Sequence, residues 1–423
     1  MHGIARALLK KLRKIRFPYV PLIEVKISRG TLLQNLRAFQ NLNKKVAVAP
    51  VLKSNAYGHG LVEVAQILDG EHLPFLCVDS YFEALILRNE GIHSPTLILG
   101  YTSLENIRGN QLSNVAFGII NLESLQRLSK HCLSRTAIHL KIDTGMHRHG
   151  IAISEVDEAV TLIRANKHIV LAGVYSHLAD ADTPRSQHTE AQIREWNKLV
   201  EKIRSEFPEV RYFHCANSAG AAHGDRIHAN VMRLGIGLYG INPIRNSPPG
   251  GPSAGDTISQ MWEIVSPTYP RVQNAGEISN GVNPSPARMT LRPALEMITR
   301  ITSTRTLKKG EAVGYNATFT APRDMRIASI PVGYYEGIDR RLSNKGTVMI
   351  RNTLCPIIGR VSMNITSVDV SHLPDIKLDE PVTAISSRSE DLNSIENIAR
   401  ACSTIPYEIL VKIPAHLRRV VVA

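Results

Sequence analysis

The chain has 423 residues, more than one hydrophobic core usually organises, so we expect two domains. Hydrophobic residues at 43% and charged residues at 21% are typical of a folded soluble protein, and no apolar run is long enough to span a bilayer. The 50 Lys and Arg against 37 Asp and Glu give a formal charge of +13, which suits nucleic-acid binding, membrane-surface binding or solubility alone. Because the body of the chain has no nucleic-acid-binding module or long basic tract, we do not expect a nucleic-acid partner.

The first residues of the chain contain no acid and hold part of the positive charge. Apolar residues recur there at roughly helical spacing, as in an interfacial helix or a transit-like leader. A secretory signal would need an apolar core, so we do not expect export. We interpret residues 1–19 as a basic extension that the fold does not need. The basic residues and His2 are His2, Arg6, Lys10, Lys11, Arg13, Lys14 and Arg16.

Short apolar runs recur over residues 20–243, with helical patterns between them. The segments Leu61–Leu68, Tyr81–Asn89 and Ala191–Ile203 place apolar residues at steps of three and four, as amphipathic helices do. Eight strand–helix units predict an α/β fold, a (β/α)8 or TIM barrel, although Pro50 in the first run cannot donate a ladder hydrogen bond. The predicted strands are Val46–Leu52, Phe75–Val78, Thr96–Leu99, Val115–Ile119, Ala137–Ile142, Ile169–Tyr175, Arg211–Cys215 and Leu234–Tyr239.

Lys53 follows the first apolar run and precedes the turn Ser54–Gly60, so its amine should emerge at the carboxyl edge of a buried strand. Partial desolvation disfavours an ammonium against the neutral amine, which could then form an imine with an aldehyde. A lysine that extends its amine into solvent at a strand end is the alternative. Further polar residues stand at or beyond the ends of other strands, where barrel enzymes build their sites. They are Lys141 with Arg148, His177, and Asn217 with Ser218.

The five cysteines are odd in number, widely spaced and without close metal-ligand pairs, so we expect a reduced, cytoplasmic protein and no metal site. Residues 244–291 are rich in Pro, Gly, Ser and Asn and are interpreted as a connector. Residues 292–423 show short apolar runs with turns, which predict a mostly β C-terminal domain. The strands expected there are Ile327–Val332, Thr347–Ile350, Ile357–Val361 and Ser367–Val370.

The segment Val51–Gly60, V-L-K-S-N-A-Y-G-H-G, closely resembles the lysine motif of the alanine racemases, in which the residue after the lysine is usually Ala. The resemblance runs from about residue 20 to the C-terminus, apart from the connector, which is longer than the family's usual link. It implies pyridoxal 5′-phosphate as cofactor and a homodimer with two composite active sites. Further matching segments, in the family's order, are Lys141–Arg148, His214–Ser218, Arg233–Ile236, Gly314–Thr318 and Gly359–Asn364.

The resemblance implies two catalytic bases, because racemisation removes a proton from one face of Cα and returns one to the other. Lys53 would hold the cofactor as an imine and act on the D-enantiomer. Tyr315, contributed by the second subunit, would act on the L-enantiomer. Without the resemblance, Tyr315 is a tyrosine in a turn.

The resemblance also assigns cofactor contacts. Arg233, supported by His177, would face the pyridine nitrogen, where a permanent cation discourages protonation and favours return of the proton to Cα. Arg148 would contact the phenolic oxygen and the substrate carboxylate, and Lys141 is a candidate for carbamylation. The phosphate group would be held by Tyr57, Ser218, Tyr407 and the amides of Gly235 and Ile236, and Asn217 is included among the cofactor-binding residues.

A small substrate pocket is implied, in which the Met363 amide holds the carboxylate while Tyr334 and Tyr407 leave room for little more than a methyl group. Two positions near the implied entry corridor depart from the family: Asn364 stands where aspartate is usual, and Glu336 replaces another aspartate. His147 and His149 flank Arg148 where smaller residues are commoner.

The sequence therefore predicts a pyridoxal-phosphate-dependent isomerase that interconverts L-alanine and D-alanine and supplies D-alanine for cell-wall precursors. A racemase of the same fold for serine or a wider range of amino acids is one alternative. A non-catalytic pyridoxal-phosphate-binding protein is another. A barrel-fold decarboxylase is less consistent with the chain, because the glycine-rich phosphate loop typical of those enzymes is not found.

Overall fold

The computed structural model describes residues 19–183, 185–244, 289–373 and 375–423. Nearly all of the predicted basic extension and most of the connector lie outside these ranges. The chain divides into two compact units. The barrel unit comprises the described residues of 26–296 together with residues 385–415 and 419–423, and the β unit comprises those of 1–25, 297–384 and 416–418. The domain bounds inferred from the sequence remain a prediction.

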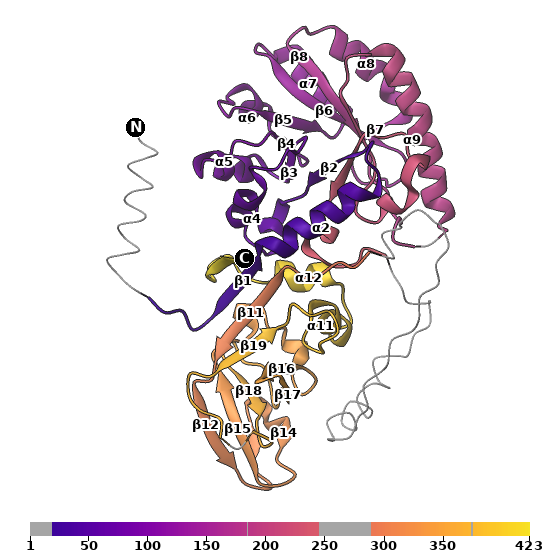
Figure 1. Ribbon diagram of the computed structural model, residues 1–423. Coiled ribbons are helices and arrows are strands. Elements are labelled where there is room, and N and C mark those ends of the chain that lie inside the picture. The colour runs from indigo at the N-terminus through magenta and orange to yellow at the C-terminus, as the bar shows by residue number, and fades with distance from the viewer. Residues whose placement is uncertain (1–18, 184, 245–288, 374) are drawn as a thin grey trace. The chain divides into compact units, whose positions relative to one another are not determined.

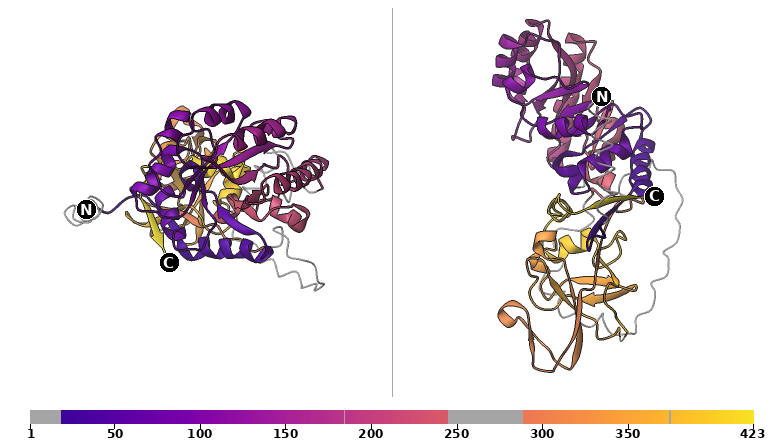
Figure 2. Two further views of the ribbon diagram at one scale, coloured as in Figure 1. Left: turned by 90° about the horizontal axis from the view of Figure 1, so that it is seen from above. Right: turned by 90° about the vertical axis from the view of Figure 1, so that its left-hand side faces the viewer.

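Parallel strands form the centre of the barrel unit, and helices lie around them (Figures 1 and 2). Strand β2 pairs with β10, and a bridge between Val51 and Cys77 joins β2 to β3. The amide of Asn230 donates to the Phe213 carbonyl at 3.0 Å between β9 and β10, so the barrel is closed. Its strands are β2 (Ala47–Pro50), β3 (Leu76–Val78), β4 (Thr96–Ile98), β5 (Val115–Ile119), β6 (Thr136–Asp143), β8 (Ile169–Tyr175), β9 (Tyr212–His214) and β10 (Val231–Leu234). The predicted (β/α)8 barrel is confirmed.

One predicted barrel strand is wrong. The eighth strand is Val231–Leu234, and residues Ile236–Tyr239 form a short 3-10 turn, η3, in place of the strand expected over Leu234–Tyr239. The backbone leaves the extended conformation at Gly235, with φ −95° and ψ −106°. A Cβ at Gly237 would lie 2.5 Å from the Phe39 ring, so a glycine is needed where the turn packs on a helix.

Several helices of the barrel unit begin at polar caps that the sequence encodes locally. Ser80 and Glu83 form a capping box, and the side chains of Ser28, Asn121 and Ser186 each accept a hydrogen bond from a first-turn amide. No helix among the described residues is long and apolar enough to cross a membrane. The helices are α2 (Arg29–Leu42), α4 (Leu61–Leu68), α5 (Tyr81–Asn89), α6 (Leu104–Arg108), α7 (Leu122–His131), α8 (Val156–Arg164), α9 (Gln187–Glu206), α11 (Ile395–Ala401) and α12 (Pro406–Val411).

The β unit is built from short antiparallel strands, as predicted. Strands β12 (Ser303–Leu307), β15 (Met325–Ile330) and β18 (Thr366–Asp369) form one sheet. The expected strand Ile357–Val361 is wrong, because Gly359 takes a left-handed φ of +71° and only Ile357 takes part in a β-bridge, with Val368. Further strands are β13 (Ala312–Val313), β14 (Phe319–Thr320), β16 (Thr347–Ile350), β17 (Thr353–Pro356), β19 (Pro381–Ile385) and most of β11 (Leu295–Arg300).

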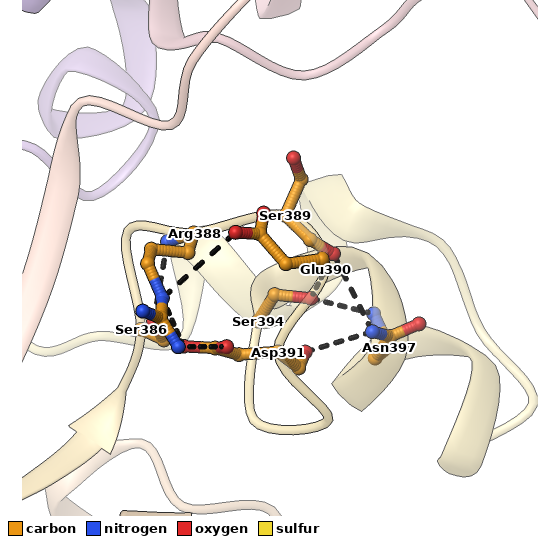
Figure 3. A network of polar contacts seen from close by, with 7 residues as sticks. All are labelled: Ser386, Arg388, Ser389, Glu390, Asp391, Ser394 and Asn397. Carbon is orange, nitrogen blue, oxygen red and sulfur yellow. Dashed lines mark hydrogen bonds and ion pairs between the residues drawn. The ribbon is translucent and has the colours of Figure 1, made fainter. Parts of the chain in front are cut away.

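A polar network holds the loop before α11 in the barrel unit (Figure 3). The guanidinium of Arg388 donates to both carboxylate oxygens of Asp391 at 2.7 and 3.0 Å, and the Ser386 hydroxyl donates to the same group at 2.6 Å. Burial raises the pKa of Asp391, but these hydrogen bonds outweigh it and leave the pKa below its ordinary value.

Replacement of Asp391 by asparagine should therefore destabilise the protein in a pH-dependent way. A carboxylate with a lowered folded-state pKa stabilises the fold above the unfolded value, about 3.9, and loses that effect as pH falls through the folded value. We expect Asp391→Asn to reduce the free energy of unfolding by about 1–3 kcal/mol at pH 7, and the difference to shrink below pH 4. Urea unfolding of the variant and the unaltered protein at several pH values measures this difference in unfolding free energy. Glu390→Gln is the control, because Glu390 is exposed and lies 3.9 Å from Arg388; an equal loss in both variants would contradict the assignment.

Candidate active site

A cavity of about 940 Å³ lies at the carboxyl ends of the barrel strands, within the barrel unit. Its wall includes residues that follow β2, β6, β8, β9 and β10, together with α12. The barrel unit thereby brings together most of the site residues predicted from the sequence. These are Lys53, Tyr57, Lys141, Arg148, His177, Asn217, Ser218, Arg233, Gly235, Ile236 and Tyr407.

Lys53 opens into this cavity three residues after β2 ends. Its side chain is 40% exposed, and its Nζ lies 3.9 Å from Oδ1 of Asp79, which follows β3. The side chain is thus partly buried, as the sequence suggested, while its amine faces the cavity. An aldehyde ligand can reach the amine directly.

The segment after Lys53 winds with the opposite hand to an ordinary helix. The four residues after Lys53 in α3 (Lys53–Tyr57) all have φ between 51° and 57°; they are Ser54, Asn55, Ala56 and Tyr57. This left-handed backbone conformation is energetically unfavourable for residues other than glycine. Hydrogen bonds hold it: the Ser54 amide donates to Glu83 at 2.8 Å, and the Leu61 amide donates to the Asn55 side chain at 2.9 Å. This left-handed turn fixes the position of Tyr57 relative to Lys53 and strand β2.

Gly58 closes this turn at φ +80°, and a Cβ there would lie 2.0 Å from the Leu410 carbonyl oxygen of α12. Gly91 has almost the same φ, +81°, but no atom within 4 Å of the same position. We expect Gly91→Ala to cost about 1–2 kcal/mol of unfolding free energy through backbone strain alone. Gly58→Ala should cost a further 1–3 kcal/mol or so, because the α12 backbone must move. Denaturant unfolding of the two variants compares these costs, and equal losses would refute the close approach.

Ser218, Gly235 and Tyr57 form one end of the cavity wall. The Ser218 hydroxyl accepts the Gly235 and Gly237 amides at 3.0 and 3.3 Å, so its own proton is free for another acceptor. A Cβ at Gly235 would lie 2.9 Å from the Tyr57 hydroxyl and would fill this space. The amide of Ile236 begins η3 and has no acceptor within that turn. A cradle of hydroxyl and amide donors of this kind suits a phosphate group.

Three tyrosines pack together beside this cradle. The Tyr57 ring lies 5.0 Å from Tyr239 and 5.8 Å from Tyr407, between ring centres. Burial raises the pKa of Tyr57 well above its ordinary value and that of Tyr407 to about 12. Both phenols therefore keep their protons near neutral pH and can donate hydrogen bonds to an anion.

Arg233 is a buried cation on β10, and the hydrogen-bond partners found for it in the described chain are neutral. Its guanidinium donates to Nδ1 of His214 at 2.8 Å and Nδ1 of His177 at 3.0 Å, and to carbonyls of Ser176, His214 and Cys215. Burial and the arginine charge lower the pKa of both histidines well below the ordinary value. No carboxylate compensates the charge among these partners, so the cavity has an electropositive floor at this point.

The histidines behind Arg233 were not assigned a role from the sequence. Because arginine only donates, Nδ1 of His214 must accept, and Nε2 then donates to Nδ1 of His139 at 2.8 Å. Burial, with the Arg233 charge, lowers the pKa of His139 to about 3, so the chain of rings stays neutral. His214 belongs to a segment noticed in the sequence. A histidine inside the apolar run of β6 is the one signal that could have indicated His139.

Lys141 lies at the end of β6 with its side chain buried and its Nζ 5.8 Å from the centre of the Tyr175 ring. Burial, followed by the charges of Arg148 and Arg233, lowers its pKa to about 8. A substantial fraction of this amine is neutral near physiological pH. Arg148 is exposed on the next loop, where Oδ1 of Asp143 accepts three successive amides, from Gly145 to His147 at 2.8 to 3.1 Å.

Three predicted site residues belong to the β unit, where they occupy neighbouring segments. Tyr315, Tyr334 and Met363 are 67%, 44% and 54% exposed. The amide of Tyr334 donates to the Ser362 carbonyl at 3.0 Å, next to Met363. A Cβ at Gly314 would lie 3.4 Å from the Arg360 amide, which brings the Tyr315 turn to the same region. No group of three potential metal ligands occurs within the described ranges.

Comparisons with known proteins identify what the chain resembles. The model of the alanine racemase N-terminal domain matches residues 27–243, and that of the C-terminal domain matches residues 294–421. An alanine racemase from a Nostoc species is 31% identical over 400 residues, covering 92% of both chains. A solved alanine racemase from Clostridium difficile 630 has a TM-score of 0.78 at 26% identity and covers 96% of both chains. One from Bacillus anthracis with bound L-Ala-P has the same TM-score at 25% identity, again over 96% of both chains.

Proposed function

Because the chain belongs to the alanine racemase family, we propose that it interconverts L-alanine and D-alanine with Lys53 and Tyr315 as the two bases. The family resemblance inferred from the motifs is thus confirmed, and with it a pyridoxal-phosphate-dependent isomerase. The assignment of individual residues is the part that is proposed. One observation supports it above all: Lys53 opens into a cavity that also presents a phosphate cradle and a buried arginine.

The cavity residues fit the cofactor. Bound pyridoxal 5′-phosphate supplies an electron sink that makes the Cα proton of an attached amino acid acidic. Tyr57, Ser218 and the amides of Gly235 and Ile236 would hold its phosphate, with Tyr407 beside them. Asn217 lines the same wall, and its side chain accepts the Gly220 amide at 2.8 Å, which fixes the turn that carries Ser218.

Arg233 and His177 would tune the cofactor. A permanently charged guanidinium donates a hydrogen bond to a ring nitrogen but does not give up its proton, so the ring stays a moderate electron sink. The His177 ring lies 3.0 Å from the guanidinium and would help to hold it in position. This combination favours return of a proton to Cα over competing reactions of the amino acid.

Lys141 and Arg148 would receive the substrate side of the cofactor. A lysine with a pKa of about 8 reacts readily with carbon dioxide, and we propose that Lys141 is carbamylated and thereby pairs with Arg148. Arg148 would then be held for the phenolic oxygen and the substrate carboxylate. Density at Nζ of Lys141 in a crystal structure decides this point.

The β unit would complete the site from a second copy of the chain. Its exposed residues Tyr315, Tyr334 and Met363 are large and apolar or aromatic, which suits a surface that becomes covered. We propose a homodimer in which Tyr315 serves as base, the Met363 amide holds the carboxylate and Tyr334 narrows the pocket. We further propose a cytoplasmic location and supply of D-alanine for cell-wall precursors.

The test is conversion of L-alanine to D-alanine by the purified protein with pyridoxal phosphate, with L-serine side by side. Faster turnover of alanine supports the proposal. Faster turnover of serine would instead indicate a serine or broad-specificity racemase. This alternative is included because Asn364 replaces the family's usual aspartate. Binding of the cofactor without turnover would indicate a non-catalytic protein, and carbon dioxide release would indicate a decarboxylase.

A further inference from the structure

Two loops of the β unit are joined side by side, and each carries a residue assigned to the substrate. One is the turn η6 (Tyr334–Glu336), and the other is residues 362–365. The amide of Tyr334 donates to the Ser362 carbonyl at 3.0 Å, and the amide of Tyr335 donates to the Met363 carbonyl at 2.9 Å. The positions of Tyr334 and Met363 therefore depend on each other.

The backbones of the two loops are in close contact at Gly333. A Cβ at Gly333 would lie 2.1 Å from the Ser362 carbonyl oxygen and 2.4 Å from that of Met363, so only glycine fits there. Within the second loop, the Ser362 amide donates to the Ile365 carbonyl at 3.0 Å. These backbone contacts hold the two loops against each other and leave them little freedom to move apart.

A side-chain pair adds a further link between the two loops. Glu336 is only 6% exposed; its Oε2 accepts the Gly333 amide at 2.9 Å, and its Oε1 accepts Nδ2 of Asn364 at 2.6 Å. A carboxylate only accepts, so the amide nitrogen of Asn364 must face it. One buried carboxylate therefore closes its own turn and holds the residue next to Met363.

We propose that Glu336 and Asn364 are positioning residues which fix the Met363 amide and the Tyr334 ring for the substrate carboxylate. The inference rests on the proposed function, in which Met363 and Tyr334 bind substrate. The pair is specific in its chemistry, because an aspartate at 364 would set two carboxylates against each other at the same short distance. Glu336 and Asn364 each depart from the family pattern, and the two side chains are hydrogen-bonded to each other.

The test uses a reversal of the pair. Asn364→Asp should raise KM for L-alanine about tenfold or more, since a hydrogen bond to a charged group becomes a repulsion, while kcat changes less. Glu336→Gln with Asn364→Asp restores one donor and one acceptor in reversed order, so KM should return towards that of the unaltered protein. Inhibition by propionate, a carboxylate of substrate size, should weaken and recover in parallel. Asn352→Asp, at an exposed asparagine in the β16–β17 turn, is the control.

The outcomes separate this inference from the function on which it rests. If the unaltered protein racemises alanine but the double variant is no better than Asn364→Asp, the pair does not position the loops and the inference is overturned. A lowered thermal midpoint with unchanged KM and propionate inhibition would show a structural role only, and would overturn it as well. An unaltered protein without racemase activity would instead refute the proposed function.

Discussion

Replacement of Lys53 by alanine should lower kcat for alanine racemisation by about 10³-fold or more, because this amine is both the attachment point of the cofactor and one of the two proposed bases. Borohydride reduction of the protein incubated with pyridoxal phosphate should fix the cofactor covalently to the peptide containing Lys53. In the Lys53→Ala variant no such labelled peptide should appear. Chiral analysis of alanine and mass spectrometry of the reduced protein measure the two effects.

Lys45→Ala is the matched control, since Lys45 is an exposed lysine at the opposite end of the same strand. It should keep both activity and labelling. Labelling of a different lysine in the unaltered protein, or full activity in Lys53→Ala, would remove Lys53 from its role. Lys141, which also lines the cavity, is the residue to inspect first in that case.

Much of the barrel was predictable from the sequence because buried parallel strands are continuous apolar runs. Strand β5 has the predicted bounds, and helices α4 and α5 also match residue for residue. The eighth strand was displaced because its apolar run continues past Gly235 into a turn. Apolar content marks burial, but glycine decides where the extended backbone ends.

The barrel part of the site was predictable for a related reason. A barrel places the ends of its strands on one rim, so Lys53, Lys141, His177 and Ser218 gather around one cavity although they are far apart in the chain. Hydrogen bonds between loops gave no such signal. The contact between Asn364 and Glu336 spans 28 positions and joins the short turn η6 to a loop, so the sequence showed each residue separately.

Tyr315→Phe should lower kcat for racemisation by about 10²–10⁴-fold while leaving one half of the chemistry intact. Phenylalanine keeps the ring but removes the hydroxyl that the proposal uses as the base for the L-enantiomer. Lys53 can still remove and return the Cα proton of D-alanine on its own face. In deuterated water, D-alanine should therefore continue to exchange its Cα hydrogen, whereas L-alanine should exchange far more slowly; proton NMR follows both.

Tyr335→Phe is the control, because Tyr335 is an exposed tyrosine of the same unit that stacks on His416 with 4.8 Å between ring centres. Equal loss of exchange for both enantiomers would mean that Tyr315 supports the site as a whole and is not a base for one enantiomer. Mixing and reassociating Tyr315→Phe with Lys53→Ala tests the partner assignment as well. If Tyr315 acts across a dimer, half of the randomly formed dimers are mixed and each has one intact site, so about a quarter of the sites should regain activity. No recovery would place Tyr315 and Lys53 of each site on one chain.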